Sequence, residues 1–371
     1  MKVIVFAGTR PEAIKVAPVI HELHKREKIN TIVCNTGQHK EMIQQAFHDF
    51  DITPTLNLDV MQPNQTLASL SSRLFEKIDQ TLKAEQPDWI LVQGDTTTVM
   101  VSALCAFYRD VRIGHIEAGL RSFNKWAPFP EEVNREIVSK VADLHFAPTK
   151  MAYANLIREG INPDDVFVTG NTVIDALHWM KDKVKGQEDE LLDTRILKAL
   201  GEGKRLVLVT GHRRENLGDG FEEICQAVRE LAERYEDVFF VYPVHLNPRV
   251  QEPVMEVLGK NEHILLLPPL SYKPFIALLN ASYMVLTDSG GIQEEAPALG
   301  KPVLVMRDVT ERPEGVKAGV SKLVGPHRQA IVQHASRLLD DDKVYKEMAH
   351  AENPYGDGHA SIRIIDALLN L

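Results

Sequence analysis

The sequence is short of cysteine, of tryptophan and of basic charge, and each shortage argues against a class of protein. Its three cysteines, Cys34, Cys105 and Cys225, are far apart and show no Cys-x-x-Cys spacing. Neither a disulfide framework nor a cysteine zinc site is indicated, and a reducing cytoplasm fits best. The formal net charge of -10 argues against a general binder of nucleic acid or anionic membranes. The three tryptophans are too scattered for a base-stacking platform.

Long apolar runs and two common ligand motifs are also missing. The apolar run that ends at Ala7 is too short for a signal-peptide core or a membrane span, and is predicted to be a buried strand. No His-x-His or His-Glu-x-x-His spacing occurs, so no metal site is predicted. The first strand of neither half is followed by Gly-x-Gly-x-x-Gly, so no nicotinamide and no other cofactor is expected.

Short β-branched runs alternate with longer segments of helical period. The expected strands are Val3 to Phe6, Thr31 to Cys34, Trp89 to Val92, Val111 to Ile116, Leu144 to Ala147, Arg205 to Thr210, Val238 to Tyr242, Ile264 to Leu267, Tyr283 to Thr287 and Val303 to Met306. This pattern, interrupted by a charged stretch over 181–204, predicts an α/β protein with two doubly wound parallel-sheet domains. We expect residues 1–170 and 355–371 to form the N-terminal domain and residues 171–354 the C-terminal domain.

The clearest ligand signal is the segment Asp288 to Glu295, with the sequence DSGGIQEE. After a strand, backbone N–H groups of Ser289, Gly290 and Gly291 can approach a pyrophosphate without interference from Cβ atoms, and a helix follows. Glu295 would repel phosphates unless it accepts hydrogen bonds from ribose hydroxyls. We predict a bound nucleotide-sugar; a bare turn with glutamates at a helix start is the alternative.

Cationic residues follow other strands, at the sheet edge where ligands of open parallel sheets bind. Arg10 and Lys15 flank a helix start that contains Pro11, and anion binding is predicted for them. His212 and Arg312 follow strands of the second half and are expected to stabilise a departing diphosphate. An ordinary surface charge is the alternative for these positions.

The first half supplies carboxylates after its strands: Asp95, Glu117 and Glu131. Asp95 could instead be the N-cap of a helix, and Glu131 could be a first-turn partner of a helix dipole. Glu117 lies between an apolar strand and Ala118-Gly119, so we expect burial to raise its pKa toward a value useful for acid or base catalysis.

These segments together resemble the non-hydrolysing UDP-N-acetylglucosamine 2-epimerases of bacteria over essentially the whole chain. The matching blocks are GTRPE from Gly8, QGDTTT from Gln93, HIEAGLR from His115, PEE from Pro130, TGNT from Thr169, DSGGIQEE from Asp288, TERPE from Thr310 and NPYGDG from Asn353. The resemblance implies Rossmann-like domains in the glycosyltransferase-B arrangement with an interdomain cleft. It also implies reversible conversion of UDP-GlcNAc to UDP-ManNAc by a cytoplasmic homodimer that serves surface-polysaccharide synthesis.

The resemblance also assigns roles to individual positions. Those that match contacts with the nucleotide-sugar are Arg10, Lys15, Asp95, Glu117, His212, Phe275, Ser289, Gly290, Gly291, Glu295 and Arg312. The expected catalytic residues are Asp95, Glu117 and Glu131, with His212. Some members bind a second UDP-GlcNAc as an activator, in a regulatory pocket that Gln38, His39 and His245 resemble in part. Such members carry Arg before Gln-Thr-Leu where this chain has Asn64, so the resemblance is incomplete there.

The chemistry of this conversion favours elimination. The C2 hydrogen is not next to a carbonyl, and without a nicotinamide the oxidative route is closed. Anti elimination of UDP from C1 would give 2-acetamidoglucal, and UDP would re-add after protonation of the other face. Two faces need two proton carriers, and closure of the domains near Thr169 to Thr172 would retain the intermediate. The alternatives are a glycosyltransferase-B type UDP-sugar transferase, a hydrolysing epimerase and a non-catalytic sensor of sugar nucleotides.

Overall fold

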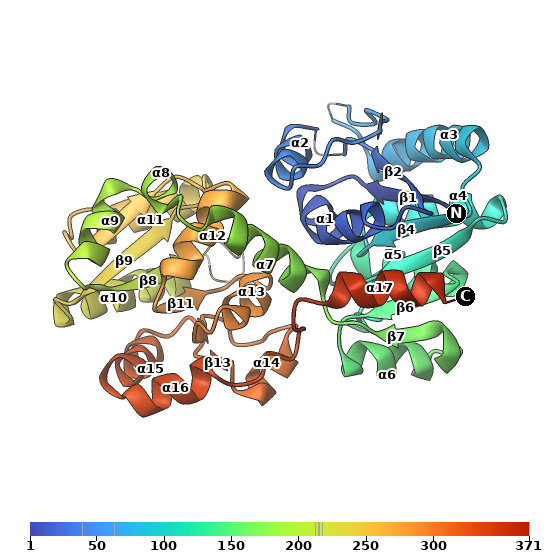
Figure 1. Cartoon of the computed structure of the whole chain (residues 1–371). Coiled ribbons are helices and arrows are strands. Elements are labelled where there is room, and N and C mark those ends of the chain that lie inside the picture. The colour runs from blue at the N-terminus through green and yellow to red at the C-terminus, as the bar shows by residue number, and fades with distance from the viewer. Residues whose placement is uncertain (39, 63, 212, 214–215, 217, 371) are drawn as a thin grey trace. The chain divides into compact units, whose positions relative to one another are not determined.

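The chain folds into two compact units, drawn in the computed structural model of Figure 1. Unit 1 comprises Met1–Trp179 and Tyr355–Leu371, and unit 2 comprises Met180–Pro354. The structure describes residues 1–38, 40–62, 64–211, 213, 216 and 218–370.

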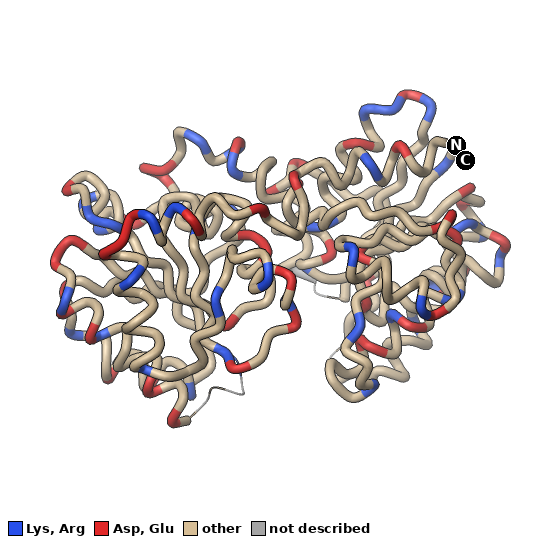
Figure 2. The backbone as a smooth tube through the Cα atoms, turned by 90° about the horizontal axis from the view of Figure 1, so that it is seen from below, with Lys and Arg blue, Asp and Glu red and all other residues tan. Residues whose placement is uncertain are grey.

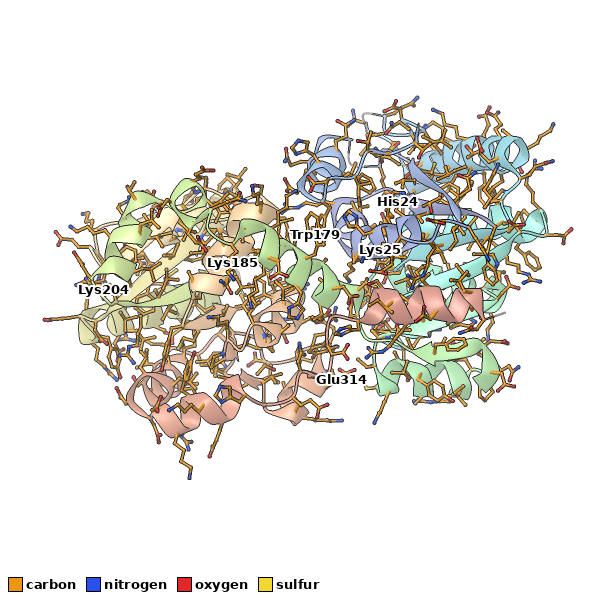
Figure 3. The ribbon with its side chains drawn as sticks, viewed as in Figure 1. His24, Lys25, Trp179, Lys185, Lys204 and Glu314 are labelled. Carbon is orange, nitrogen blue, oxygen red and sulfur yellow. The ribbon has the colours of Figure 1, made fainter. Side chains whose placement is uncertain are left out.

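The chain passes from unit 1 to unit 2 inside helix α7 (Thr172–Val184), whereas the sequence analysis placed the change just before this helix. Trp179, labelled in Figure 3, still packs on unit 1. Its ring stacks on those of His21 and Phe50, with centroids 5.2 Å and 5.0 Å away. Most of α7 therefore belongs to unit 1.

The described part of unit 1 is built on a parallel sheet of seven strands in the order β3-β2-β1-β4-β5-β6-β7. The strands are β1 (Lys2–Ala7), β2 (Asn30–Asn35), β3 (Leu56–Asn57), β4 (Trp89–Gln93), β5 (Arg112–Ile116), β6 (Leu144–Ala147) and β7 (Val166–Val168). The helices between them are α1 (Arg10–His24), α2 (Lys40–Asp49), α3 (Leu67–Glu85), α4 (Thr97–Tyr108), α5 (Glu131–Val141) and α6 (Lys150–Arg158). The strand order reverses between β1 and β4, which makes their carboxyl ends the topological switch point.

The core of unit 1 explains why its strands read as continuous apolar runs. Ile4 and Phe6 of β1 and Ile90 and Val92 of β4 lie fully or almost fully buried in one cluster with apolar side chains of α3 and α4. Central parallel strands are covered by helices on both faces, so alternate residues need not be polar. The polar residues that follow these strands are therefore available for a site.

The described part of unit 2 contains a second parallel sheet, of six strands in the order β10-β9-β8-β11-β12-β13. The strands are β8 (Arg205–Thr210), β9 (Val238–Pro243), β10 (Ile264–Leu267), β11 (Met284–Thr287), β12 (Val303–Val305) and β13 (Ser321–Leu323). The helices are α8 (Glu188–Leu191), α9 (Thr194–Gly201), α10 (Asp219–Arg234), α11 (Pro248–Leu258), α12 (Tyr272–Ala281), α13 (Ile292–Ala298), α14 (Pro313–Ala318), α15 (Arg328–Asp340) and α16 (Asp342–Ala349). Its order reverses between β8 and β11, so the turn after β11 lies at a second switch point.

The last helix, α17 (Ala360–Leu369), returns to unit 1. Asp175 of α7 is its remote cap: the carboxylate accepts the Ala360 N–H at 3.2 Å, the Ser361 N–H at 2.8 Å and the Ser361 hydroxyl at 2.6 Å. An ion pair of 3.2 Å between Arg26 and Asp366 also joins α17 to the segment just after α1.

The prediction of two Rossmann-like parallel-sheet domains is confirmed, and all the expected strands form. Three further strands, β3, β7 and β13, were not predicted and are two or three residues long. Within the described residues, every helix is too short or too polar to cross a membrane. Figure 2 shows positive and negative residues interspersed along both units.

Candidate active site

The Glu117 carboxylate accepts hydrogen bonds from three different segments of unit 1. Glu117 follows β5 with a φ of 65°, a left-handed conformation that is uncommon outside glycine. Its Oε1 accepts hydrogen bonds from Lys15 Nζ at 2.6 Å and Asn171 Nδ2 at 3.0 Å, and its Oε2 accepts one from Gln93 Nε2. Three donors favour the ionised carboxylate and oppose the effect of burial. The expected rise in its pKa stays a prediction.

Asp95, after β4, has electrostatic neighbours from three other segments. Burial raises the pKa of its carboxyl from 3.8 to about 6, and the charges of Glu117 and Glu131 act in the same direction. Arg135 of α5 opposes them through an ion pair of 3.1 Å between its Nη2 and Asp95 Oδ2, and Lys15 opposes them too. The charges of Glu117 and Glu131 thus both reach Asp95, whose raised pKa suits an acid or a base.

The two structural alternatives for these carboxylates have different outcomes. Thr96, not Asp95, is the N-cap of α4, and its hydroxyl accepts an N–H of the first turn at 3.4 Å. The N-cap alternative for Asp95 is therefore wrong. Glu131 is the first residue of α5, where a negative charge suits the helix dipole, so that alternative stays open beside a catalytic role.

Arg10 begins α1, just after a crowded turn. A Cβ on Gly8 would lie 2.4 Å from Thr98 Oγ1, so this position admits only glycine without a rearrangement. The buried Glu12 accepts the N–H groups of Gly8 at 2.9 Å and Thr9 at 2.6 Å, which completes a capping box. Arg10 itself forms no ion pair with the described residues, and its anion-binding role stays a prediction.

In unit 2 the predicted turn of Ser289, Gly290 and Gly291 follows β11, and α13 begins just after it. Two guanidinium groups lie beside the turn: a Cβ on Gly290 would be 3.7 Å from Arg213 Nη2 and 3.9 Å from Arg312 Cζ. Arg312 also donates from Nε to the buried Glu294. Arg312 was predicted from the sequence, and Arg213 places a second positive charge next to the turn.

Glu295 lies in the first turn of α13, beside Glu294. It is buried, and its Oε1 accepts a hydrogen bond of 3.0 Å from the Tyr272 hydroxyl of α12. A Cβ on Gly291 would be 3.9 Å from Glu295 Oε2, so the carboxylate faces the glycine turn. Phe275 is partly buried one turn along α12 from Tyr272. These positions suit contacts with a nucleoside, which stay a prediction.

His212 and the residues predicted for the regulatory pocket are not brought together in the described structure. His212 and His39 lie outside the described residues. Gln38, in unit 1, accepts a hydrogen bond of 3.0 Å from a threonine hydroxyl. His245 is exposed in unit 2, where its Nδ1 accepts a backbone N–H at 3.1 Å. The regulatory pocket stays a prediction.

Comparison with known proteins bears on the whole chain. A family model described as UDP-N-acetylglucosamine 2-epimerase matches residues 21–369. The chain belongs to the UDP-N-acetylglucosamine 2-epimerase family. Among its relatives, the UDP-N-acetylglucosamine 2-epimerase of Escherichia coli is 49% identical over 373 residues, covering 100% of this chain and 99% of its own. The enzyme of the same name from Campylobacter jejuni is 48% identical, covering 99% and 97%.

Solved structures of the epimerase family agree with the fold. UDP-GlcNAc 2-epimerase from Neisseria meningitidis, bound to UDP-GlcNAc, is 45% identical with a TM-score of 0.89, and the match covers 100% of both chains. The Methanocaldococcus jannaschii enzyme, in complex with UDP-GlcNAc and UDP, is 31% identical with a TM-score of 0.79 and the same coverage. The resemblance inferred from the sequence blocks is confirmed.

Sequence reasoning missed several partners of the candidate epimerase site. Gln93 and Asn171 lie inside blocks of the family resemblance, so their presence in those blocks was the available signal. Arg135 could be predicted only as a residue of the helix that follows Pro130-Glu131-Glu132. Nothing in the sequence indicated its ion pair with Asp95. Tyr272 carried no signal, because its partner Glu295 comes 23 residues later on another helix.

Proposed function

We propose that this chain interconverts UDP-GlcNAc and UDP-ManNAc by inverting C2 of the sugar. The observation that carries the proposal is the group of three carboxylates at the switch point of unit 1, in which burial raises the pKa of Asp95 to about 6. Inversion needs proton transfer on both faces of C2, and a transferase would need only one base. Membership of the 2-epimerase family supplies the substrate class.

The proposed reaction is an anti elimination followed by an addition. One carboxylate takes the C2 proton while the C1–O bond to UDP breaks, which forms the C1=C2 bond of 2-acetamidoglucal. A second group then protonates C2 from the other face, and UDP re-adds at C1, so no other reactant is consumed. Asp95, Glu117 and Glu131 are the proposed proton carriers. Glu117, which accepts hydrogen bonds from Lys15 and Asn171, is the carboxylate proposed as the base.

Unit 2 is proposed to hold UDP throughout this cycle. Ser289, Gly290 and Gly291 would present backbone N–H groups to the diphosphate, with Arg312 beside them. Glu295 would accept hydrogen bonds from ribose hydroxyls, and Phe275 would contact the nucleotide. Arg10 of unit 1 and His212 complete the proposed set, and closure of the units around the substrate would exclude water.

The setting of the enzyme is part of the same proposal. We infer a cytoplasmic homodimer that supplies UDP-ManNAc for surface-polysaccharide synthesis. Support for a reducing compartment comes from the three cysteines, which are buried and unpaired by disulfides. A second UDP-GlcNAc bound near Gln38, His39 and His245 would be an activator.

Isotope exchange tests the proposal. The protein is incubated with UDP-GlcNAc in D₂O, without acceptor, and C2 is followed by NMR. We expect deuterium at C2 in both UDP-GlcNAc and UDP-ManNAc, with the UDP linkage intact. Unlabelled UDP-ManNAc would refute the elimination, and free ManNAc with UDP would indicate a hydrolysing epimerase. A sugar transferred only when an acceptor is added would indicate a transferase, and binding without turnover would indicate a sensor.

A further inference from the structure

We propose that Asn171 is a positioning residue that ties Glu117 to both passages of the chain between the units. The inference rests on the proposed function, since Glu117 is taken as a proton carrier. Asn171 is buried, with 4% of its surface exposed, and immediately precedes α7, the helix through which the chain leaves unit 1. Its Nδ2 donates to Glu117 Oε1 at 3.0 Å.

The other end of the Asn171 amide fixes its orientation. Oδ1 accepts the N–H of Val173 at 3.1 Å, at the start of α7, so Nδ2 must face away from the helix and toward Glu117. A side chain that caps a helix is held by that helix. A movement of the first turn of α7 is therefore transmitted to the carboxylate through one rigid amide.

The main chain of Asn171 is joined to the returning passage. Its N–H donates to the carbonyl of Tyr355 at 2.7 Å, and Tyr355 is the first residue of the chain after it returns from unit 2. Gly170 and Gly356 let the leaving and returning chain segments approach closely: a Cβ on Gly170 would be 3.2 Å from Gly356 Cα. Both passages and Glu117 thus meet at one residue.

The first test removes the donor and keeps the cap. Asn171→Thr and Asn171→Asp both retain an oxygen that can accept the Val173 N–H, but neither has the amide N–H that reaches Glu117, and Asp adds a like charge. We expect kcat to fall about tenfold for Thr and about 100-fold for Asp, with KM for UDP-GlcNAc within about twofold of wild type. Asn162→Asp, at another helix N-cap in unit 1, is the control and should keep wild-type kcat.

The second test disturbs the returning passage without touching Glu117. In Gly356→Ala the new Cβ would be at an ordinary contact distance of 3.4 Å from the Asn171 nitrogen, but a φ of 139° is strained for any residue with a side chain, so the backbone beside Asn171 must shift. We expect kcat to fall about tenfold while KM is kept. Gly186→Ala is the control, because that glycine also has a positive φ but has no atom within 4 Å of the added Cβ.

The outcomes separate this inference from the proposed function. Wild-type protein without C2 exchange would refute the function, whereas exchange in wild type with unchanged kcat in Asn171→Thr and Asn171→Asp would refute the positioning role. The positioning role would also be refuted if kcat fell equally in Asn171→Thr and Asn171→Asp and the fall were accompanied by a lower Tm or a raised KM. Crystal structures of wild type and Asn171→Thr decide it independently of turnover: we expect the Glu117 carboxylate to move away from residue 171, and an unmoved carboxylate would overturn the proposal.

Discussion

At the scale of single residues, the same side chain has different roles a few positions apart. Glu131 and Glu132 are neighbours at the start of α5. Glu132 is fully buried and accepts the backbone N–H groups of Ser122 at 2.9 Å and Phe123 at 2.7 Å, so it holds the preceding loop. Glu131 instead contributes to the field at Asp95. Environment, and not residue type, separates a structural carboxylate from a candidate acid or base.

Glu117→Gln keeps the shape of the side chain and removes its charge. We expect C2 exchange to fall by at least about 100-fold, because the amide cannot take a proton, while the affinity for UDP stays within about twofold. NMR exchange in D₂O and calorimetric titration with UDP measure the two effects. Glu136→Gln, an exposed change on α5, is the control and should exchange normally. Lost UDP affinity in Glu117→Gln would make Glu117 a substrate holder.

The raised pKa of Asp95 makes stability depend on pH. The folded pKa of about 6 lies above the ordinary value of 3.8, so the folded protein binds this proton more tightly. The stabilisation is fully present below about pH 4 and is lost as the pH rises to about 6, an effect of at most about 3 kcal/mol. We therefore expect the difference in Tm, Asp95→Asn minus wild type, to rise from pH 4 to pH 7, because the amide does not titrate. A Tm difference that does not change with pH would contradict the shift.

At the scale of elements, glycines with positive φ decide how closely strands and helices approach. Gly119 follows β5 with a φ of 87°, and a Cβ there would be 2.2 Å from the carbonyl oxygen of Ala152 in α6. Gly160 has a φ of 84° but no atom within 4 Å of an added Cβ. The two positions have nearly the same φ and differ in the space around them.

These two glycines allow strain and crowding to be measured separately. We expect Gly160→Ala to lower the free energy of unfolding by about 1 kcal/mol, from backbone strain alone. Gly119→Ala should lower it by about 3 kcal/mol or more, because α6 must also shift. Urea unfolding of both variants measures the difference. Equal losses would mean that α6 gives way freely and that the packing at Gly119 is loose.

At the scale of the whole molecule, α17 makes unit 1 depend on both ends of the chain. Asp175 caps this helix from α7, and the apolar side chains Ile364, Ile365 and Leu368 are buried. The ion pair of Arg26 with Asp366 is exposed and is expected to contribute little.

Asp175→Ala should loosen the C-terminal helix. It leaves two N–H groups and a hydroxyl of α17 without their acceptor, so we expect a loss of about 1–3 kcal/mol in unfolding free energy and faster proteolysis after Tyr355. Limited proteolysis with mass spectrometry and thermal unfolding measure both effects. Asp366→Ala is the control and should change Tm by little. Unchanged proteolysis in Asp175→Ala would show that apolar packing alone holds α17.

Much of the fold could be predicted because the signals for it are local. The run Val3 to Phe6 predicts a buried strand on its own, and the Ser289-Gly290-Gly291 turn follows β11 as expected. Strands of two or three residues, such as β3, were missed because so short a run has no periodicity. The N-cap alternative for Asp95 was wrong because two adjacent residues, Asp95 and Thr96, can both cap a helix, and Thr96 does so.

By itself, the sequence determined the alternation of strands and helices, the order of the family blocks and the residues that end each strand. Only the tertiary structure decided which of those ends meet. Lys15 and Glu117 are 102 positions apart, and Asn171 comes 54 positions after Glu117. Both contact Glu117 because the segments that follow β1, β5 and β7 meet at one edge of the sheet, and the order of its strands is set by packing of the whole core. Local patterns carry no information about that choice, so the partners that hold the candidate base came from the fold alone.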